Sequence, residues 1–169
     1  ISVVADSRSL IASVAPLVGV GNTFPLIHVG EHHGRAGCLL ATLNSFVLDY
    51  ILRQKASGSH LNFYIFKQLP ILNPGIFAGP AAWDSAASLD GWVNQRVLEL
   101  AYTSWDLEPF ARSCDHNGSP FVWDEARRRI LRNELDAACF HLYGIQRTDV
   151  DYVMETFPIV KRRDVQAHG

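Results

Sequence analysis

Residues 43–73 have the sequence LNSFVLDYILRQKASGSHLNFYIFKQLPILN, and this stretch decides the expected fold of the first half of the chain. Its apolar residues recur at steps of three and four, which places them on one stripe of an α-helix. Extended slightly upstream, that stripe comprises Leu39, Leu40, Leu43, Phe46, Val47, Tyr50 and Ile51. The pattern predicts a helix from about Arg35 to Lys55. The sequence Ala56-Ser57-Gly58-Ser59 then ends it, because Gly58 suits the left-handed conformation of helix ends.

Extended segments are predicted on both sides of this helix. Ser9–Ala15 and Phe24–Val29 are short runs rich in β-formers, and the glycines between them predict a turn that joins two strands. The run His60–Phe66, HLNFYIF, alternates in part and predicts a further extended stretch before a region rich in proline and glycine. Residues 1–75 are therefore expected to form a small mixed α/β unit.

The second half of the chain is predicted to be helical. Its apolar periodicity predicts four helices, over Leu89–Trp105, Leu107–Ala111, Asp124–Tyr143 and Thr148–Glu155. Asp124 and Thr148 are candidate N-terminal caps, and Gly144 is a candidate stop. Residues 85–169 are therefore expected to form an α-helical C-terminal module, and the fold class is predicted to be α+β.

The net charge of −2 conceals an uneven distribution along the chain. Residues 1–82 carry five basic and three acidic side chains, residues 83–125 carry two and eight, and residues 126–169 carry eight and six. No global basic field therefore indicates a nucleic-acid partner. Between residues 35 and 67, however, only Asp49 opposes four basic residues, a pattern that fits either an anionic partner or a solvated face. These four are Arg35, Arg53, Lys55 and Lys67.

A cluster of polar side chains at the end of the predicted helix is the candidate binding site. Proteins read DNA with polar side chains that reach base edges, held in register by phosphate contacts. Seven such residues lie within ten positions, namely Arg53, Gln54, Lys55, Ser57, Ser59, His60 and Asn62. Arg35 and Lys67 complete the predicted DNA-binding set. The alternative is an ordinary helix C-terminus, where basic residues favour the negative end of the dipole.

Motifs for several kinds of chemistry are missing from the sequence. It contains no G-x-G-x-x-G or G-x-x-x-x-G-K-[ST] phosphate loop, no G-x-S-x-G and no H-E-x-x-H. His28, His32, His33 and Cys38 lie within eleven residues, and a small zinc-dependent enzyme built around them is the third and weakest functional alternative. Their spacing lacks the tight pairs of structural zinc sites. We therefore predict no metal and no catalytic residue in this chain.

Cysteine usage and hydropathy indicate the expected compartment. The three cysteines are an odd number placed far apart, which favours a reducing environment over a disulfide framework. Proline, glycine and polar residues interrupt the longest uncharged stretch, Ser9–Gly30, so no transmembrane segment is predicted. No secretory signal is evident, and the missing initiator Met suggests part of a longer chain. A cytoplasmic protein without membrane contact is expected.

The 43–73 stretch resembles the target-recognition region of type IIG-like N6-adenine DNA methyltransferases and fused restriction-modification enzymes. In that family a helix carrying L-N-S precedes a basic, glycine-containing turn and a K-Q-L-P stretch, and all three are present here. The resemblance extends over most of the chain, through SLIASVAPLVGVGNTFPLI, RVLELAYTSWDLEPFA, RRRILRNELDAACFHLYGI and DVDYVMETFPIVKRRD.

This resemblance implies a DNA-recognition role in a restriction-modification or phage-defence system. The family's catalytic domain lies upstream and holds S-adenosylmethionine and an Asn-Pro-Pro-Tyr-type motif for the flipped adenine. Neither is expected in this chain. Asn73-Pro74 does not supply the motif, because it continues as Gly75-Ile76. The chain is thus expected to bind double-stranded DNA and the upstream methyltransferase domain, without catalysis of its own. Replacing Arg53 and Lys55 together by alanine is predicted to weaken DNA binding without loss of fold.

Two aromatic groups allow other interpretations. Phe63, Tyr64 and Phe66 suit stacking on an extruded base, although aromatic residues in a partly alternating run are more often core, and we predict core. The acidic middle contains four tryptophans, which are expected to be packing anchors. The same acidic, tryptophan-rich region supports the second functional class, a protein-interaction module that makes no direct DNA contact. Its tryptophans are Trp83, Trp92, Trp105 and Trp123.

Overall fold

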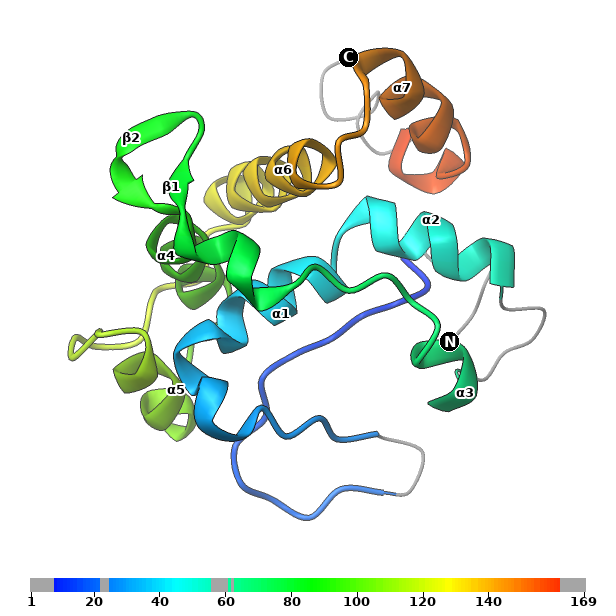
Figure 1. Ribbon diagram of the computed structural model, residues 1–169. Helices are drawn as coiled ribbons and strands as arrows, with labels where there is room; N and C mark the ends of the chain where they lie inside the picture. Colours follow the sequence, from blue (N-terminus) through cyan, green and yellow to red (C-terminus); the bar gives the residue numbers. More distant parts are fainter. Residues whose placement is uncertain (1–7, 22–24, 56–60, 62, 162–169) are drawn as a thin grey trace. The chain divides into compact units, whose positions relative to one another are not determined.

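The structure is a computed structural model that describes residues 8–21, 25–55, 61 and 63–161, with Glu31, His32 and His33 described in backbone only (Figure 1). The fold class is α+β, as predicted: helices predominate, and the described residues contain one small antiparallel sheet. The elements follow the chain in the order η1 (Gly30–Arg35), α1 (Ala36–Leu43), α2 (Phe46–Lys55), α3 (Phe63–Phe66), η2 (Pro74–Ala78), β1 (Pro80–Ala81), β2 (Asp84–Ser88), α4 (Leu89–Ala101), η3 (Trp105–Leu107), α5 (Glu108–Ser113), α6 (Glu125–Leu142) and α7 (Arg147–Glu155).

Two compact units make up the chain, and each combines segments that are distant in sequence. Unit 1 comprises Ile1–Ala12, Thr42–Leu72 and Glu134–Gly169, and unit 2 comprises Ser13–Ala41 and Asn73–Asn133. The predicted division into 1–75 and 85–169 therefore differs from the observed units. The reason is that α2, from the first half of the chain, packs against α7 near its end.

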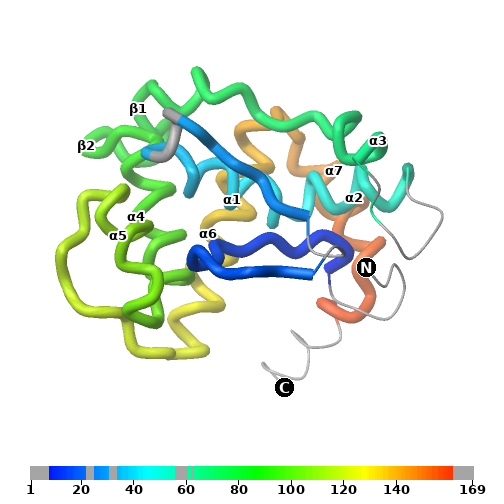
Figure 2. Tube along the Cα trace, turned by 90° about the horizontal axis from the view of Figure 1, so that it is seen from below, coloured from blue at the N-terminus to red at the C-terminus, as the bar shows by residue number. Residues whose placement is uncertain are grey.

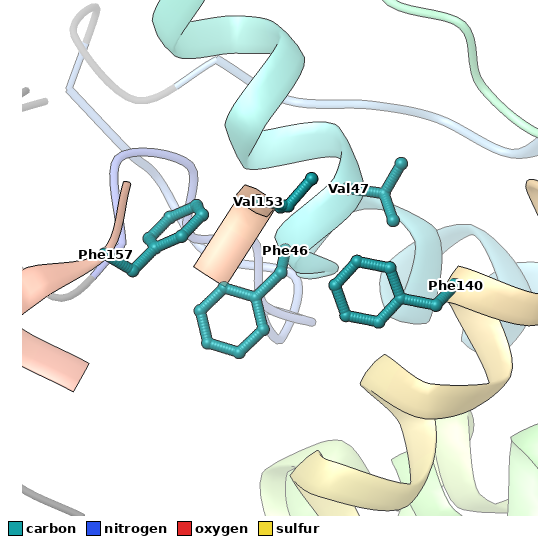
Figure 3. Close-up of a cluster of buried hydrophobic side chains, with 5 residues drawn as sticks. All are labelled: Phe46, Val47, Phe140, Val153 and Phe157. Carbon is teal, nitrogen blue, oxygen red and sulfur yellow. The ribbon is translucent and has the colours of Figure 1, made fainter. Parts of the chain in front are cut away.

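The core of unit 1 joins α2 to the last two helices. Phe46 and Val47 of α2 meet Phe140 of α6, Val153 of α7 and Phe157 just beyond α7 (Figure 3). The rings of Phe46 and Phe157 pack edge to face with centroids 4.8 Å apart. Burying such large apolar side chains is the main stabilising contribution of this unit.

The helix predicted over residues 35–55 is interrupted, and α1 and α2 are bent by 56° relative to each other. Ser45 explains the interruption. Its hydroxyl donates to the Thr42 carbonyl (2.8 Å) and accepts the Leu48 N–H (3.2 Å), so it caps the start of α2 as an N-cap serine does. Apolar periodicity continues through the bend and did not reveal it.

The predicted strands before α1 are not strands in the structure. Residues 9–15 and 25–29 form no regular secondary structure, and no strand pairs with them in the described part of the chain (Figure 2). The side chain of Asn44 takes the place of a strand at one position, because its amide accepts the Ala12 N–H and donates to the Ala12 carbonyl, both at 3.0 Å. The prediction of two strands here is therefore wrong.

The observed sheet lies in unit 2, after the end of the predicted 1–75 unit. Strands β1 and β2 pair antiparallel, with Pro80 opposite Ser88 and Ala81 opposite Asp84. Ser88 also caps α4, because its hydroxyl accepts the Gly91 N–H (3.3 Å). The short hairpin thus leads directly into the helix against which it packs.

The second-half helices follow their local signals closely. Asp124 caps α6 by accepting the Arg127 N–H (3.1 Å), and Gly144 ends that helix region with a φ of +69°. Pro109 lies in the first turn of α5, as expected. The predicted cap at Thr148 is wrong, because α7 already begins at Arg147.

The run predicted as extended, His60–Phe66, contains the single helical turn α3 in its described part. The Lys67 N–H donates to the Phe63 carbonyl (2.9 Å), which closes that turn. His60 lies outside the described residues. The apolar pair Ile65 and Leu69, four residues apart, is buried, and this spacing is helical rather than alternating.

No single helix in the described ranges is long and apolar enough to span a bilayer. The α1–α2 pair passes that test of length and composition when its two helices are joined, but the pair is sharply bent.

Candidate nucleic-acid interface

The structure describes five of the nine predicted DNA-binding residues. Gln54, Lys55 and Lys67 are exposed and belong to unit 1, whereas Arg35 is half-buried and belongs to unit 2. Arg53 is also half-buried, in unit 1. The remaining predicted residues, Ser57, Ser59, His60 and Asn62, lie outside the described residues.

Arg53 is held inside unit 1 rather than presented to solvent. Its side chain is 13% exposed, and its Nε lies 3.3 Å from Oδ1 of Asp49. Its Nη1 donates to the Thr156 carbonyl (3.2 Å), and its guanidinium lies 4.2 Å from the ring centre of Phe157. Although the next residue, Gln54, is exposed, the Arg53 guanidinium contacts Asp49 of α2 and the Thr156 carbonyl at the end of α7, so it links these two helices.

Asp49 connects this cation to the N-terminal segment. Its carboxylate is buried. Oδ2 accepts a hydrogen bond from the Ser9 N–H (2.8 Å), and Oδ1 accepts one from Nε of Arg53. A buried carboxylate needs such partners, because an uncompensated charge away from water is strongly unfavourable. Asp49 is thus a structural residue. It is the single acidic residue between positions 35 and 67, and its carboxylate is buried instead of lying at the surface.

A second buried ion pair lies in the same unit. Arg8 Nη2 contacts Asp136 Oδ2 at 2.5 Å, and the Arg8 guanidinium lies 3.3 Å from the ring centre of Phe46. Asp136 Oδ1 also accepts the Phe46 N–H (2.9 Å). Burial raises the pKa of the Asp136 carboxyl, and the neighbouring Arg8 opposes that rise. Arg8 is therefore engaged internally as well.

The turn α3 presents aromatic side chains to solvent. Phe63 is 61% exposed and Tyr64 is 64% exposed, whereas Ile65 is buried. Lys67 and Gln68 follow directly and are exposed. The prediction that Phe63 and Tyr64 belong to the core is wrong, because the helical turn gives the buried side to Ile65 and Leu69.

The basic run at the start of α6 is largely engaged at the surface of unit 2. Arg127 forms a two-pronged contact with Glu99 (2.8 and 3.0 Å), and this contact lowers the pKa of the Glu99 carboxyl. The guanidinium of Arg128 lies 3.6 Å from the ring centre of Trp123. Arg129 is exposed.

The tryptophans of the acidic region divide into two groups. Trp92 is buried, with Trp83 packed edge to face against it at 5.1 Å. Trp105 and Trp123 are 61% and 62% exposed, and Val122 beside the latter is almost fully exposed. The prediction of packing anchors is confirmed for Trp92 and wrong for the exposed pair.

Of the residues that metal or adenine chemistry would need, Cys38 and Asn73 are described, whereas the side chains of His32 and His33 are not. The described residues contain no group of three or more His, Cys, Asp or Glu side chains suited to a metal. Cys38 is buried. Its thiol pKa is raised to about 12, mainly by burial and to a smaller extent by the negative charge of Asp90, and this disfavours a thiolate ligand. The Asn73 side chain accepts the Gly75 N–H (2.8 Å) and caps η2. The Asn73 amide oxygen is therefore engaged within its own turn.

Comparison of the chain with protein-family models, curated proteins and solved structures finds no match.

Proposed function

We propose that this chain is the DNA-binding, target-selecting part of a bacterial N6-adenine DNA methyltransferase of a restriction-modification or phage-defence system, acting in the cytoplasm and non-catalytic by itself. Methyl transfer from S-adenosylmethionine would belong to the methyltransferase domain of the same enzyme. The resemblance of the 43–73 stretch to target-recognition regions motivates this proposal.

One observation carries the proposal: between Asp49 and Asp84 the chain contains no acidic residue, and its exposed lysines lie beside exposed glutamines. We call residues 50–83 the cationic segment. Lys55 follows exposed Gln54 at the end of α2, and Lys67 precedes exposed Gln68 after α3. Because Asp49 is buried and paired, it does not cancel this charge at the surface.

These residue types suit a duplex partner. Lysine contacts phosphate as a point charge, which contributes affinity without sequence preference. Glutamine both donates and accepts hydrogen bonds and pairs well with adenine edges. The cationic segment therefore combines the two kinds of contact that sequence-selective binding needs.

The test is fluorescence anisotropy of the chain with a mixed-sequence duplex over a series of salt concentrations. We expect affinity to fall steeply with salt, and Lys55→Ala with Lys67→Ala to weaken binding and reduce the salt slope by about one for each phosphate that is no longer neutralised. The matched control is Arg112→Ala with Arg132→Ala, which removes two exposed cations from unit 2. Equal weakening by both double variants would contradict the assignment of the cationic segment, and no binding at low salt would contradict the function.

A protein-interaction module is the second candidate, supported by exposed apolar side chains in unit 2. Trp105, Val122 and Trp123 lie at the surface there, and so do Leu17 and Val18. Exposed apolar surface of this kind marks interaction sites. If the chain binds no DNA but shifts its tryptophan emission on mixing with the methyltransferase domain, this second function is favoured.

A further inference from the structure

The turn α3 exposes two aromatic side chains, and packing within unit 1 does not explain their exposure. Phe63 and Tyr64 expose more than half of their surface, and neither ring packs against another aromatic ring within the described part of the chain. Two adjacent large aromatic residues at the surface lose favourable burial, so their exposure calls for a partner.

The turn itself is anchored, so the rings are held outward. Ile65 and Leu69 are buried below it, and backbone hydrogen bonds link Lys67 to Phe63 (2.9 Å) and Leu69 to Phe66 (3.1 Å). Just beyond it, the hydroxyl of Tyr143 donates to the Pro70 carbonyl (2.7 Å). Because Ile65 already fills the buried position, Phe63 and Tyr64 have no place in the core of unit 1.

The surroundings of the rings indicate the chemistry of that partner. Lys67 lies one helical turn after Phe63, and Gln68 lies one turn after Tyr64, with its Nε2 donating to the Tyr64 carbonyl (3.1 Å). The whole cationic segment lacks acidic residues. Aromatic faces flanked by a cation and a hydrogen-bonding amide match a nucleobase with its phosphate, because bases stack on aromatic rings while lysine neutralises the backbone.

We infer that Phe63 and Tyr64 form a stacking site for an unstacked base of DNA, with Lys67 at the adjoining phosphate. A paired base inside a duplex offers its edges but not its ring faces, so the site would favour DNA in which a base has left the stack. This inference rests on the proposed DNA-binding function, and it adds a preference that the lysines alone would not confer.

The experiment compares two duplexes of the same sequence and length, one intact and one with a single bulged 2-aminopurine. Wild type is expected to bind the bulged duplex about tenfold more tightly than the intact one, in line with alanine substitutions at base-stacking aromatics. Binding should also quench the 2-aminopurine emission. Phe63→Leu with Tyr64→Leu keeps apolar side chains but removes the aromatic faces, so it should abolish the preference and the quenching while retaining affinity for the intact duplex.

The control variant is Trp105→Leu with Trp123→Leu, which removes two aromatic side chains of closely similar exposure from unit 2. It should keep both the preference and the quenching. The inference is overturned if wild type binds the two duplexes equally, or if the Phe63/Tyr64 variant retains the preference. Failure of wild type to bind the intact duplex at low salt would instead overturn the proposed function, so the two failures are distinguishable.

Discussion

Replacing Arg53 with alanine is expected to destabilise unit 1 rather than merely remove a DNA contact. The guanidinium pairs with buried Asp49, donates to the Thr156 carbonyl and stacks on the ring of Phe157. Alanine removes all three interactions and leaves the Asp49 carboxylate buried with only the Ser9 N–H as a polar partner from this set.

The magnitude follows from the buried charge. Removing one partner of a buried ion pair costs about 3–5 kcal/mol, because the other charge stays away from water. Two features place the cost of losing Arg53 near the lower end of this range. The Ser9 N–H still donates to the Asp49 carboxylate, and the buried Nη2 of Arg53 has no hydrogen-bond partner among the described residues. We therefore expect a loss of about 3 kcal/mol. For a chain of this size that corresponds to a fall in Tm of about 6–12 °C.

Urea unfolding followed by circular dichroism measures this loss, with Lys55→Ala as the matched control. Lys55 is exposed on the same helix, so its replacement should change the unfolding free energy by less than about 0.5 kcal/mol. Combining Arg53→Gln with Asp49→Asn should cost less than the sum of the two single changes, because neither leaves an unpaired charge in the double variant. An Arg53→Ala protein as stable as the Lys55→Ala protein would refute the reasoning.

Three further predictions test contacts inside unit 1 or inside unit 2. Asn44→Ala removes both hydrogen bonds to Ala12 and should lower the free energy of unfolding by about 1–2 kcal/mol, with faster hydrogen exchange at the Ala12 amide. Gly37→Ala should destabilise by about 1–3 kcal/mol, measured by urea unfolding, because a Cβ there collides with Asn94; a gain in stability would show that helix propensity, worth about 1 kcal/mol, prevails instead. Cys38 should resist iodoacetamide in the native state up to pH 10 and react on unfolding, since its thiol pKa is raised to about 12; native stability should correspondingly fall as pH rises above 9.0, where the unfolded thiol ionises.

The internal contacts of Arg53 change how the DNA-binding surface is tested. The sequence predicted that Arg53→Ala with Lys55→Ala would preserve the fold, because both residues lie at the basic end of one helix. In the structure only Lys55 is exposed, so that double variant would confuse a loss of stability with a loss of binding. Lys55 and Lys67 are the pair that tests binding alone.

Local signals predicted the helical half of the chain well. Asp124 and Gly144 mark the limits of α6 because a cap and a left-handed glycine act within one turn of the residues that carry them. The fold class and the acid-free cationic segment also follow from the sequence alone, since neither depends on which distant residues meet.

Tertiary structure decided which side chains of that segment face solvent. Arg53 is half-buried because Thr156, 103 residues later, lies against it, and the aromatic turn is exposed because Ile65 and Leu69 take the buried side. Hydropathy gives a residue's preference for burial but not its partner. Burial of a charge requires a specific opposite charge. Whether an aromatic ring is exposed depends on whether neighbouring side chains already occupy the core position. Both depend on contacts between distant segments, which spacing along the chain does not specify.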